Sequence, residues 1–153
     1  MSKYDVLIIG HPSKDINIEH KGETRHTVGG AVTFSTYSAV ACGAVTGAVI
    51  KHALEDKGNV DDLPLAPGDL YFRPSERTVS IRNTYLSADK ERRLCETISI
   101  ADPVIPEDIP DVEATVFQLA GLIRGDLDPD VIIELSKRGQ VALDAQGMLR
   151  CVD

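Results

Sequence analysis

The chain has 153 residues, of which 42% are hydrophobic and 26% charged, and its formal net charge is −8. These values are ordinary for a soluble globular protein, and the length is enough to bury one sizeable core. An acidic surface repels nucleic-acid phosphates and anionic lipid head groups, so we expect neither nucleic acid nor membrane as a main partner. The charge is also what solubility alone requires, so it identifies no ligand.

The cysteines and histidines show no pattern typical of a metal or redox site. The three cysteines, Cys42, Cys95 and Cys151, are far apart and form no Cys-x-x-Cys pair. The four histidines lack a ligand spacing such as His-x-x-x-His, and we interpret them as solvated or structural. We therefore expect no metal site and a reduced, cytoplasmic protein. The sequence shows neither an apolar signal region nor a run long enough to cross a membrane.

The first third of the chain reads as strands around one helix. An apolar run that ends at Gly10 is typical of a buried parallel strand, and Lys21-Gly22 is typical of a hairpin turn. A stretch of small residues after two glycines predicts a helix that stops at Gly43. The predicted elements are a strand at 4–9, a hairpin at 15–20 and 23–28, a helix at 31–42 and a second core strand at 45–51.

The middle of the chain differs in character, because residues 53–69 are polar and rich in turn residues, with at most a short helix near 53–57. Three strand-like segments follow, at 70–73, 77–86 and 92–100. The second alternates between apolar and polar residues, which indicates a sheet with one wet face. We interpret residues 70–100 as antiparallel strands outside the main parallel sheet.

The last third returns to strand–helix–strand order. Residues 114–120 predict a strand, Asp128-Pro129 predict a helix start, and residues 140–144 predict another core strand. The Glu107-Asp108 pair is interpreted as a solvated turn. Alternation of this kind predicts a parallel sheet covered by helices. The expected fold class is α/β, a partial doubly wound and mostly parallel sheet with an antiparallel, lid-like set of strands.

Two segments are candidates for ligand binding. Gly10 turns the chain at the carboxyl edge of the sheet, where ligands bind in open α/β folds, and Asp15 follows it there. The Asp15 carboxylate either accepts hydrogen bonds from two adjacent hydroxyls or caps backbone amides in a turn. Gly29-Gly30 precedes the helix, so backbone amides either face a ligand closely or form a tight turn without one.

The order of these segments resembles the amino-terminal half of the ribokinase-like (PfkB-type) carbohydrate kinase family. The resemblance covers essentially the whole chain: Gly10 with Asp15, a hairpin, Gly29-Gly30 entering a small-residue helix, and Asp144-Ala145-Gln146-Gly147-Met148-Leu149-Arg150 after a core strand. Residues 1–153 are then the amino-terminal part of one such domain, with lid-like strands at about 15–28 and 70–100.

The resemblance implies a role for four residues in substrate binding. Asp15 matches the family's aspartate that binds sugar hydroxyls, and Gly29 and Gly30 match the di-glycine that lies against the substrate. Phe34 stands where the family often has asparagine, and Ser13 stands where ribokinase itself has asparagine. A phenyl ring cannot replace an amide, so ribose is disfavoured. Phe34 either packs on a flatter ligand, as in inositol- or nucleoside-directed members, or belongs to the core.

The family's Gly-Ala-Gly-Asp motif, which supplies the anion hole and the catalytic base, is missing from these residues. The nearest match, Ala66-Pro67-Gly68-Asp69, has a proline that removes a needed N–H and is followed by a strand. No Walker A sequence is present either. We therefore expect no catalytic residue here and no activity from this chain alone. ATP and Mg²⁺ are implied for the intact family enzyme and are not expected to bind well to this chain.

The leading interpretation is the substrate-binding half of a sugar, cyclitol or nucleoside kinase, which in intact form transfers phosphoryl from ATP to a hydroxyl of a small polyhydroxylated substrate. The alternative is a noncatalytic α/β binding module that self-associates, as a homodimer, through lid strands or an exposed sheet edge. A small Rossmann-like nucleotide-binding domain is a third reading, without a glycine fingerprint to support it.

Overall fold

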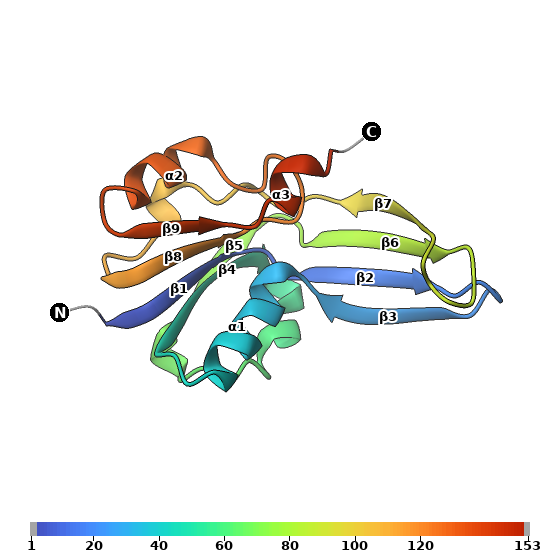
Figure 1. The fold of residues 1–153 in the computed structure, drawn as a ribbon, viewed down its shortest axis with the longest axis horizontal. Coiled ribbons are helices and arrows are strands. Elements are labelled where there is room, and N and C mark those ends of the chain that lie inside the picture. The colour runs from blue at the N-terminus through green and yellow to red at the C-terminus, as the bar shows by residue number, and fades with distance from the viewer. Residues whose placement is uncertain (1–2, 152–153) are drawn as a thin grey trace.

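The computed structural model describes residues 3–151, which fold into a parallel sheet and a second, smaller sheet that projects from it (Figure 1). The larger sheet has five strands in the order β5-β4-β1-β8-β9, and the smaller has four in the order β3-β2-β6-β7. The strands are β1 (Tyr4–Gly10), β2 (Ser13–Ile18), β3 (Thr24–Gly29), β4 (Thr46–Ala53), β5 (Leu70–Ser75), β6 (Val79–Tyr85), β7 (Arg93–Ser99), β8 (Ala114–Ala120) and β9 (Gln140–Leu143).

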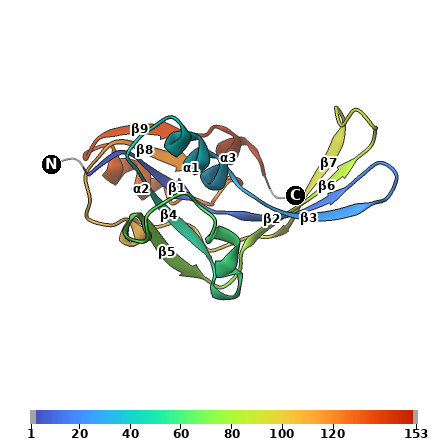
Figure 2. The same ribbon diagram turned by 90° about the horizontal axis from the view of Figure 1, so that it is seen from below.

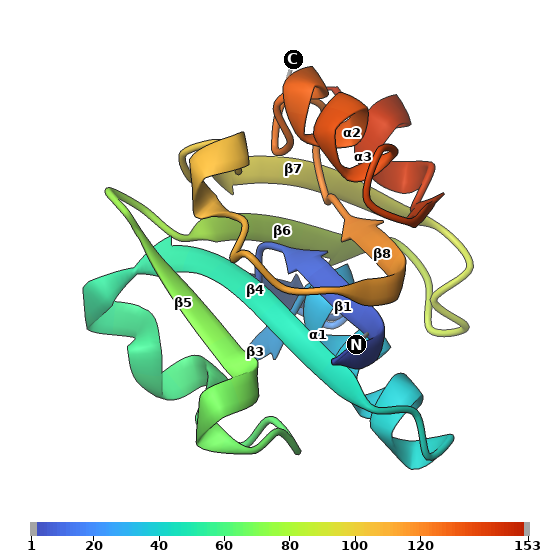
Figure 3. The same ribbon diagram turned by 90° about the vertical axis from the view of Figure 1, so that its left-hand side faces the viewer.

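Every pairing in the five-stranded sheet is parallel, and Figure 3 shows β5, β4, β1 and β8 side by side. All eight residues of β4 are buried, including the polar Lys51 and His52, as expected for an interior strand of a sheet covered on both faces. Successive side chains of β1 enter opposite faces: Leu7 and Ile9 join one core cluster, and Ile8 joins the other.

Helices cover both faces of this sheet. The helix α1 (Ala31–Ala41) packs Val32 against Ile8 and Ile50 on one face. The helix α2 (Pro129–Leu135) packs Val131 and Leu135 in the cluster around Phe117 on the other face. A shorter helix, α3 (Gln146–Leu149), follows β9. Among residues 3–151 no helix is long and apolar enough to span a membrane.

Short helices connect several strands. Three 3-10 turns, η1 (Leu54–Val60), η2 (Pro67–Asp69) and η3 (Pro106–Asp108), lie between strands. The α2 helix begins as the sequence predicts, because Asp128 accepts a 2.8 Å hydrogen bond from Asp130 N and Pro129 occupies the first turn.

We call the four-stranded sheet, β3-β2-β6-β7, the lid sheet. The β2–β3 hairpin is antiparallel, as predicted from Lys21-Gly22, and β6 pairs in parallel with β2 and antiparallel with β7. Its strands extend away from the body, and α1 and α3 lie near their base (Figures 1 and 2). The expected α/β fold, with a parallel sheet, covering helices and a separate strand set, is confirmed.

Three expectations from the sequence are wrong in detail. Residues 70–75 form β5, which pairs in parallel with β4 at the edge of the main sheet, so they are not part of the lid. Residues 140–143 form a strand, but it is an edge strand with most of its residues exposed and not a core strand. Asp108 is not solvated: it is buried and accepts a 2.7 Å hydrogen bond from Lys51 Nζ. A buried cation on β4 offsets the desolvation cost of that carboxylate.

Candidate functional site

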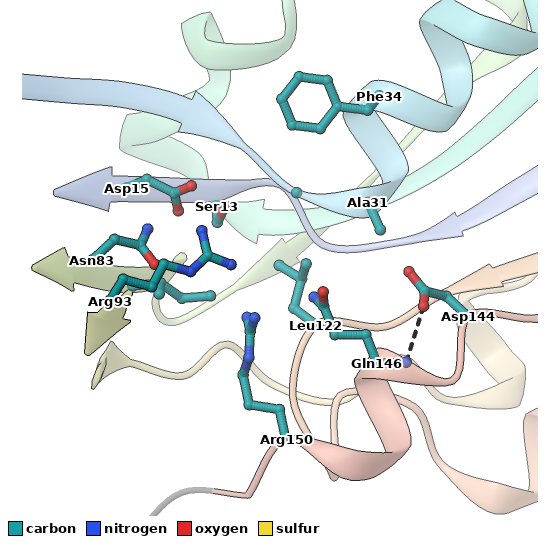
Figure 4. Close-up of a pocket in the computed structure, with 12 residues that line it drawn as sticks. Ser13, Asp15, Ala31, Phe34, Asn83, Arg93, Leu122, Asp144, Gln146 and Arg150 are labelled. Atoms are coloured by element: carbon teal, nitrogen blue, oxygen red, sulfur yellow. Dashed lines mark hydrogen bonds between the residues drawn. The ribbon is translucent and has the colours of Figure 1, made fainter. Parts of the chain in front are cut away.

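A cavity of about 320 Å³ lies where the main sheet meets the base of the lid sheet (Figure 4). The β1 and β8 strands lie at the point where strand order reverses, with β4 on one side and β9 on the other. Open α/β sheets bind ligands at the carboxyl ends of strands at such a point. The lining residues are Ser13, Asp15, Gly30, Ala31, Phe34, Ile81, Asn83, Arg93, Leu122, Asp144, Gln146 and Arg150.

Asp15 lies on β2 in the wall of this cavity and is half-buried. Its Oδ1 atom is buried and has no hydrogen-bond partner among the described residues. A buried carboxylate oxygen without a partner is costly, and this one leaves an open acceptor position at the cavity wall. A hydroxyl of a bound molecule would supply the missing donor.

The two glycines before α1 lie directly against Asp15 and the start of β2. A Cβ on Gly29 would come within 2.6 Å of Asp15 Oδ2, so any side chain there would displace the carboxylate. Gly30 has a φ of 103°, and a Cβ on it would meet the His11 carbonyl oxygen at 2.7 Å. Thr33 Oγ1 donates a 2.9 Å hydrogen bond to the Gly29 carbonyl and so anchors this turn to α1. Gly30 lines the cavity, whereas Gly29 shapes it through Asp15.

Phe34 lies on the first turn of α1 and lines the cavity. Its ring points toward the lid strands (Figure 4). It is 63% exposed, so it is not a core residue. An exposed aromatic ring beside polar groups offers an apolar surface to one side of a ligand.

Five polar residues of the lining were not among the candidates from the sequence. Asn83 and Arg93 come from the lid strands, and Asp144, Gln146 and Arg150 come from the segment after β9. The segment after β9 carries part of the family resemblance, but its separation from Asp15 along the chain gives no sign that both line one cavity. The only sequence signal for Asn83 is the alternation of residues 77–86, and Arg93 has none.

The segment after β9 is fixed by backbone contacts. Asp144 Oδ1 accepts a 3.0 Å hydrogen bond from Gln146 N, as Figure 4 shows. The Arg150 carbonyl accepts a 2.8 Å hydrogen bond from Arg124 N, which ties this segment to the loop after β8. Two carboxylates and two guanidinium groups therefore line the cavity, and their charges balance. A balanced set of donors and acceptors suits an uncharged polyol better than an anion.

A buried polar pair supports the floor of the cavity below Leu122. Asp126 Oδ2 accepts hydrogen bonds of 2.8 and 3.0 Å from Leu122 N and Ile123 N. The same oxygen lies 3.9 Å from His11 Nδ1, and the other ring nitrogen of His11 pairs with the Asp102 carbonyl at 2.9 Å. Burial lowers the pKa of His11, and the nearby Asp126 carboxylate opposes that shift.

The nearest match to the kinases' glycine motif lies away from the cavity. Asp69, the aspartate of the nearest glycine motif, accepts a 2.8 Å hydrogen bond from the Tyr4 hydroxyl. Tyr4 begins β1, so Asp69 lies at the edge of the sheet opposite the cavity, just before β5. Among residues 3–151 no group of three or more His, Cys, Asp and Glu side chains is placed to hold a metal ion.

Comparisons with known proteins agree with this arrangement. No protein-family model matches the chain. Inositol 3-kinase of Arabidopsis thaliana is 27% identical over 97% of the chain and 41% of its own length. A pyrophosphate-dependent kinase of the ribokinase family, solved with a pyrophosphate analogue and myo-inositol, is 29% identical with a TM-score of 0.83, over 95% of this chain and 51% of that one.

A structure of a pyrophosphate-dependent myo-inositol-1 kinase, converted to a myo-inositol-3 kinase by two substitutions, is 27% identical with a TM-score of 0.79. That match covers 97% of this chain and 50% of the other. The chain thus spans about half the length of the relatives it matches. In sequence and in fold, the chain is similar to the amino-terminal half of ribokinase-family (PfkB-type) kinases.

Proposed function

We propose that residues 1–153 form the acceptor-binding half of a kinase that phosphorylates a polyol, with a cyclitol such as inositol as the favoured substrate class. The observation that carries the proposal is Asp15, whose buried Oδ1 lacks a partner at the wall of the cavity. The relatives that bind or phosphorylate myo-inositol support a cyclitol over a nucleoside.

The bound polyol would lie between two unlike walls. Asp15 accepts hydrogen bonds from adjacent hydroxyls on the lid side, and the Phe34 ring packs against the C–H face of the ligand ring. Asp144 and Arg150 contact hydroxyls from the opposite side. Each of these groups binds or orients the acceptor.

Phosphoryl transfer requires groups outside these 153 residues. When bound, ATP or, as in the pyrophosphate-dependent relatives, pyrophosphate would supply the phosphoryl group, with Mg²⁺ neutralising its charge. This chain's part is to hold the acceptor and to exclude water through the lid sheet. We therefore expect no ATP turnover by the purified chain.

Isothermal titration of the 153-residue chain with myo-inositol, ribose and adenosine tests this proposal. Wild type should bind myo-inositol most tightly, and Asp15→Asn should weaken binding by about tenfold or more, because a charge-assisted hydrogen bond contributes about 1.5–3 kcal/mol. Asp61→Asn, on an exposed carboxylate outside the cavity, is the matched control and should bind as wild type does. Equal affinity in the Asp15 and Asp61 variants, or ATP turnover by the chain, contradicts the proposal.

A second candidate is self-association, which specific exposed residues favour. Leu143 on the exposed edge strand β9 and Leu149 at the end of α3 are both exposed. Leu94 and Ile98 on the outer lid strand β7 are exposed as well. Exposed edges and apolar side chains promote pairing with another copy. Light scattering should then give the mass of a homodimer, and a monomer at high concentration would exclude this candidate.

A further inference from the structure

Among the polar side chains that the lid sheet contributes to the cavity, only Ser13 is more buried than Asn83. Asn83 lies on β6 and lines the cavity, yet it is only 6% exposed. Its Nδ2 donates a 3.2 Å hydrogen bond to Asn17 Oδ1, so the carboxamide oxygen is left for the cavity. In Figure 4 the Asn83 side chain stands beside Asp15 and Arg93 on the lid side of the cavity.

The partner of Asn83 is itself held by a third side chain. Asn17 lies directly opposite Asn83 in the pairing of β2 with β6. Its Nδ2 donates a 2.9 Å hydrogen bond to Thr27 Oγ1 on β3. Thr27 in turn lies directly opposite Asp15. Two hydrogen bonds thus join three neighbouring strands, from the exposed hairpin to the cavity; we call Asn83, Asn17 and Thr27 the amide relay.

The relay orients a carboxamide that would otherwise have two interchangeable ends. An amide that donates from its nitrogen to Asn17 must present its oxygen on the other side. The Asn17 amide is oriented in the same way, because its nitrogen faces Thr27. Cross-strand hydrogen bonds of this kind also reduce the freedom that Asn83 would lose when a ligand binds.

We propose that the amide relay fixes Asn83 as a hydrogen-bond acceptor in the cavity, so that Asn83 determines which hydroxyl configuration of a cyclitol is bound. Asn17 and Thr27 are positioning residues, because they act through Asn83 and are absent from the cavity lining. This inference rests on the proposed polyol-binding function, and it adds the residue that discriminates between stereoisomers.

A fixed acceptor favours the isomer whose hydroxyl reaches it. Where a hydroxyl points away, the buried amide oxygen is left without a donor, and sites built to hydrogen-bond a hydroxyl reject such ligands. myo-Inositol and scyllo-inositol differ in the configuration of one hydroxyl only, so they are suitable probes. We expect the wild-type chain to bind one of the two more tightly.

Titration of both inositols against two substitutions of Asn17 tests the relay. Asn17→Leu removes both hydrogen bonds. The ratio of the two Kd values, taken as the weaker-binding inositol over the tighter-binding one, should then fall by about threefold to tenfold. Asn17→Asp keeps an acceptor for the Asn83 amide, and the Thr27 hydroxyl can turn to donate to it, so the ratio should stay near the wild-type value. An unchanged ratio in Asn17→Leu, or an equal loss in both variants, overturns the proposal.

A ligand-free measurement separates this inference from the proposed function. The chain contains three asparagines, Asn17, Asn59 and Asn83, so their side-chain amide signals are simple to assign by NMR. One Asn83 amide proton should exchange slowly in wild type and in Asn17→Asp, and quickly in Asn17→Leu. Asn59, outside the lid sheet, is the internal reference.

The outcomes are distinguishable. If neither inositol binds while the Asn83 proton is protected, the proposed function fails, and with it the role of Asn83 in reading hydroxyls. If inositol binds and the Asn83 proton exchanges as fast as those of Asn59, the relay is wrong while the proposed function stands. Thr27→Val removes one of the two hydrogen bonds and should reduce the Kd ratio less than Asn17→Leu does. Thr27→Ser keeps the hydroxyl, so its Kd ratio should equal that of wild type.

Discussion

The five-stranded sheet buries its central strands on both faces, whereas the lid sheet leaves most of β3 and β7 exposed. Core residues such as Phe117 and Ile50 pack between the main sheet and its helices. The lid strands instead carry alternating polar side chains, including Asp15, Asn17 and Asn83, that face the cavity or one another. The comparison indicates that the main sheet carries most of the packed core, whereas the lid sheet contributes polar side chains to the cavity.

Truncation of one large apolar side chain in each sheet should give the largest contrast. Phe117 is fully buried, and Phe117→Ala should lower the free energy of unfolding by about 3–5 kcal/mol. Leu94 on β7 is 56% exposed, and Leu94→Ala should cost less than about 1 kcal/mol. Urea denaturation measures both. Comparable losses would mean that the lid sheet also carries a packed core.

The junction between the two sheets should be next in sensitivity. Gly30→Ala combines a φ of 103° with a contact of 2.7 Å to the His11 carbonyl, and should lower the free energy of unfolding by about 2–3 kcal/mol. Gly22→Ala at the hairpin tip is the matched control, because its φ is 88° but no atom lies within 4 Å of the new Cβ. It should cost only about 1 kcal/mol. If both variants lose the same free energy, the close approach at Gly30 has no energetic weight.

The pH dependence of stability should come from the main sheet and its adjoining loop. Burial lowers the pKa of both His11 and His52 in the folded chain. The unfolded chain therefore binds these protons first, and stability is lost as the pH falls below about 6.5.

Each histidine should contribute a slope of about 0.7 kcal/mol per pH unit at that pH, which approaches about 1.4 kcal/mol per pH unit from one unit below it. Urea melts between pH 5 and pH 7.5 measure the slope, with His20→Gln as a control because His20 is exposed. Stability that is flat across this range in wild type would show that neither histidine stays neutral when the chain is folded. Carboxylates with a lowered pKa, such as Asp102, lose their contribution to stability only at a lower pH, where they become protonated.

Much of the fold could be predicted from the sequence, because local signals and tertiary structure agree there. The apolar run at β1, the Lys21-Gly22 turn and the Asp128-Pro129 helix start each specify an element through short-range chemistry. The placement of β5 could not be predicted, since a six-residue strand carries no signal for the sheet it joins. The exposure of β9 depends on its position at the sheet edge, which is likewise a property of the whole fold.

The candidate site divides in the same way. Asp15, Gly30 and Phe34 lie together at the cavity, as the family resemblance implies, and their role in binding stays a prediction. Asn83 and Arg93 had no motif around them, because alternation predicts that a residue faces one side of a strand but not what it faces. Lys51 and Asp108 are 57 residues apart, so their buried ion pair could be found only in the folded chain.

A crystal structure of the chain with myo-inositol tests the central claim most directly, because it shows whether lid and main sheet hold one ligand between them. The account predicts a polyol with its hydroxyls on Asp15 and Asn83 and its ring against Phe34. A polyol bound elsewhere, or phosphates of ATP held by backbone amides of these residues, would contradict it.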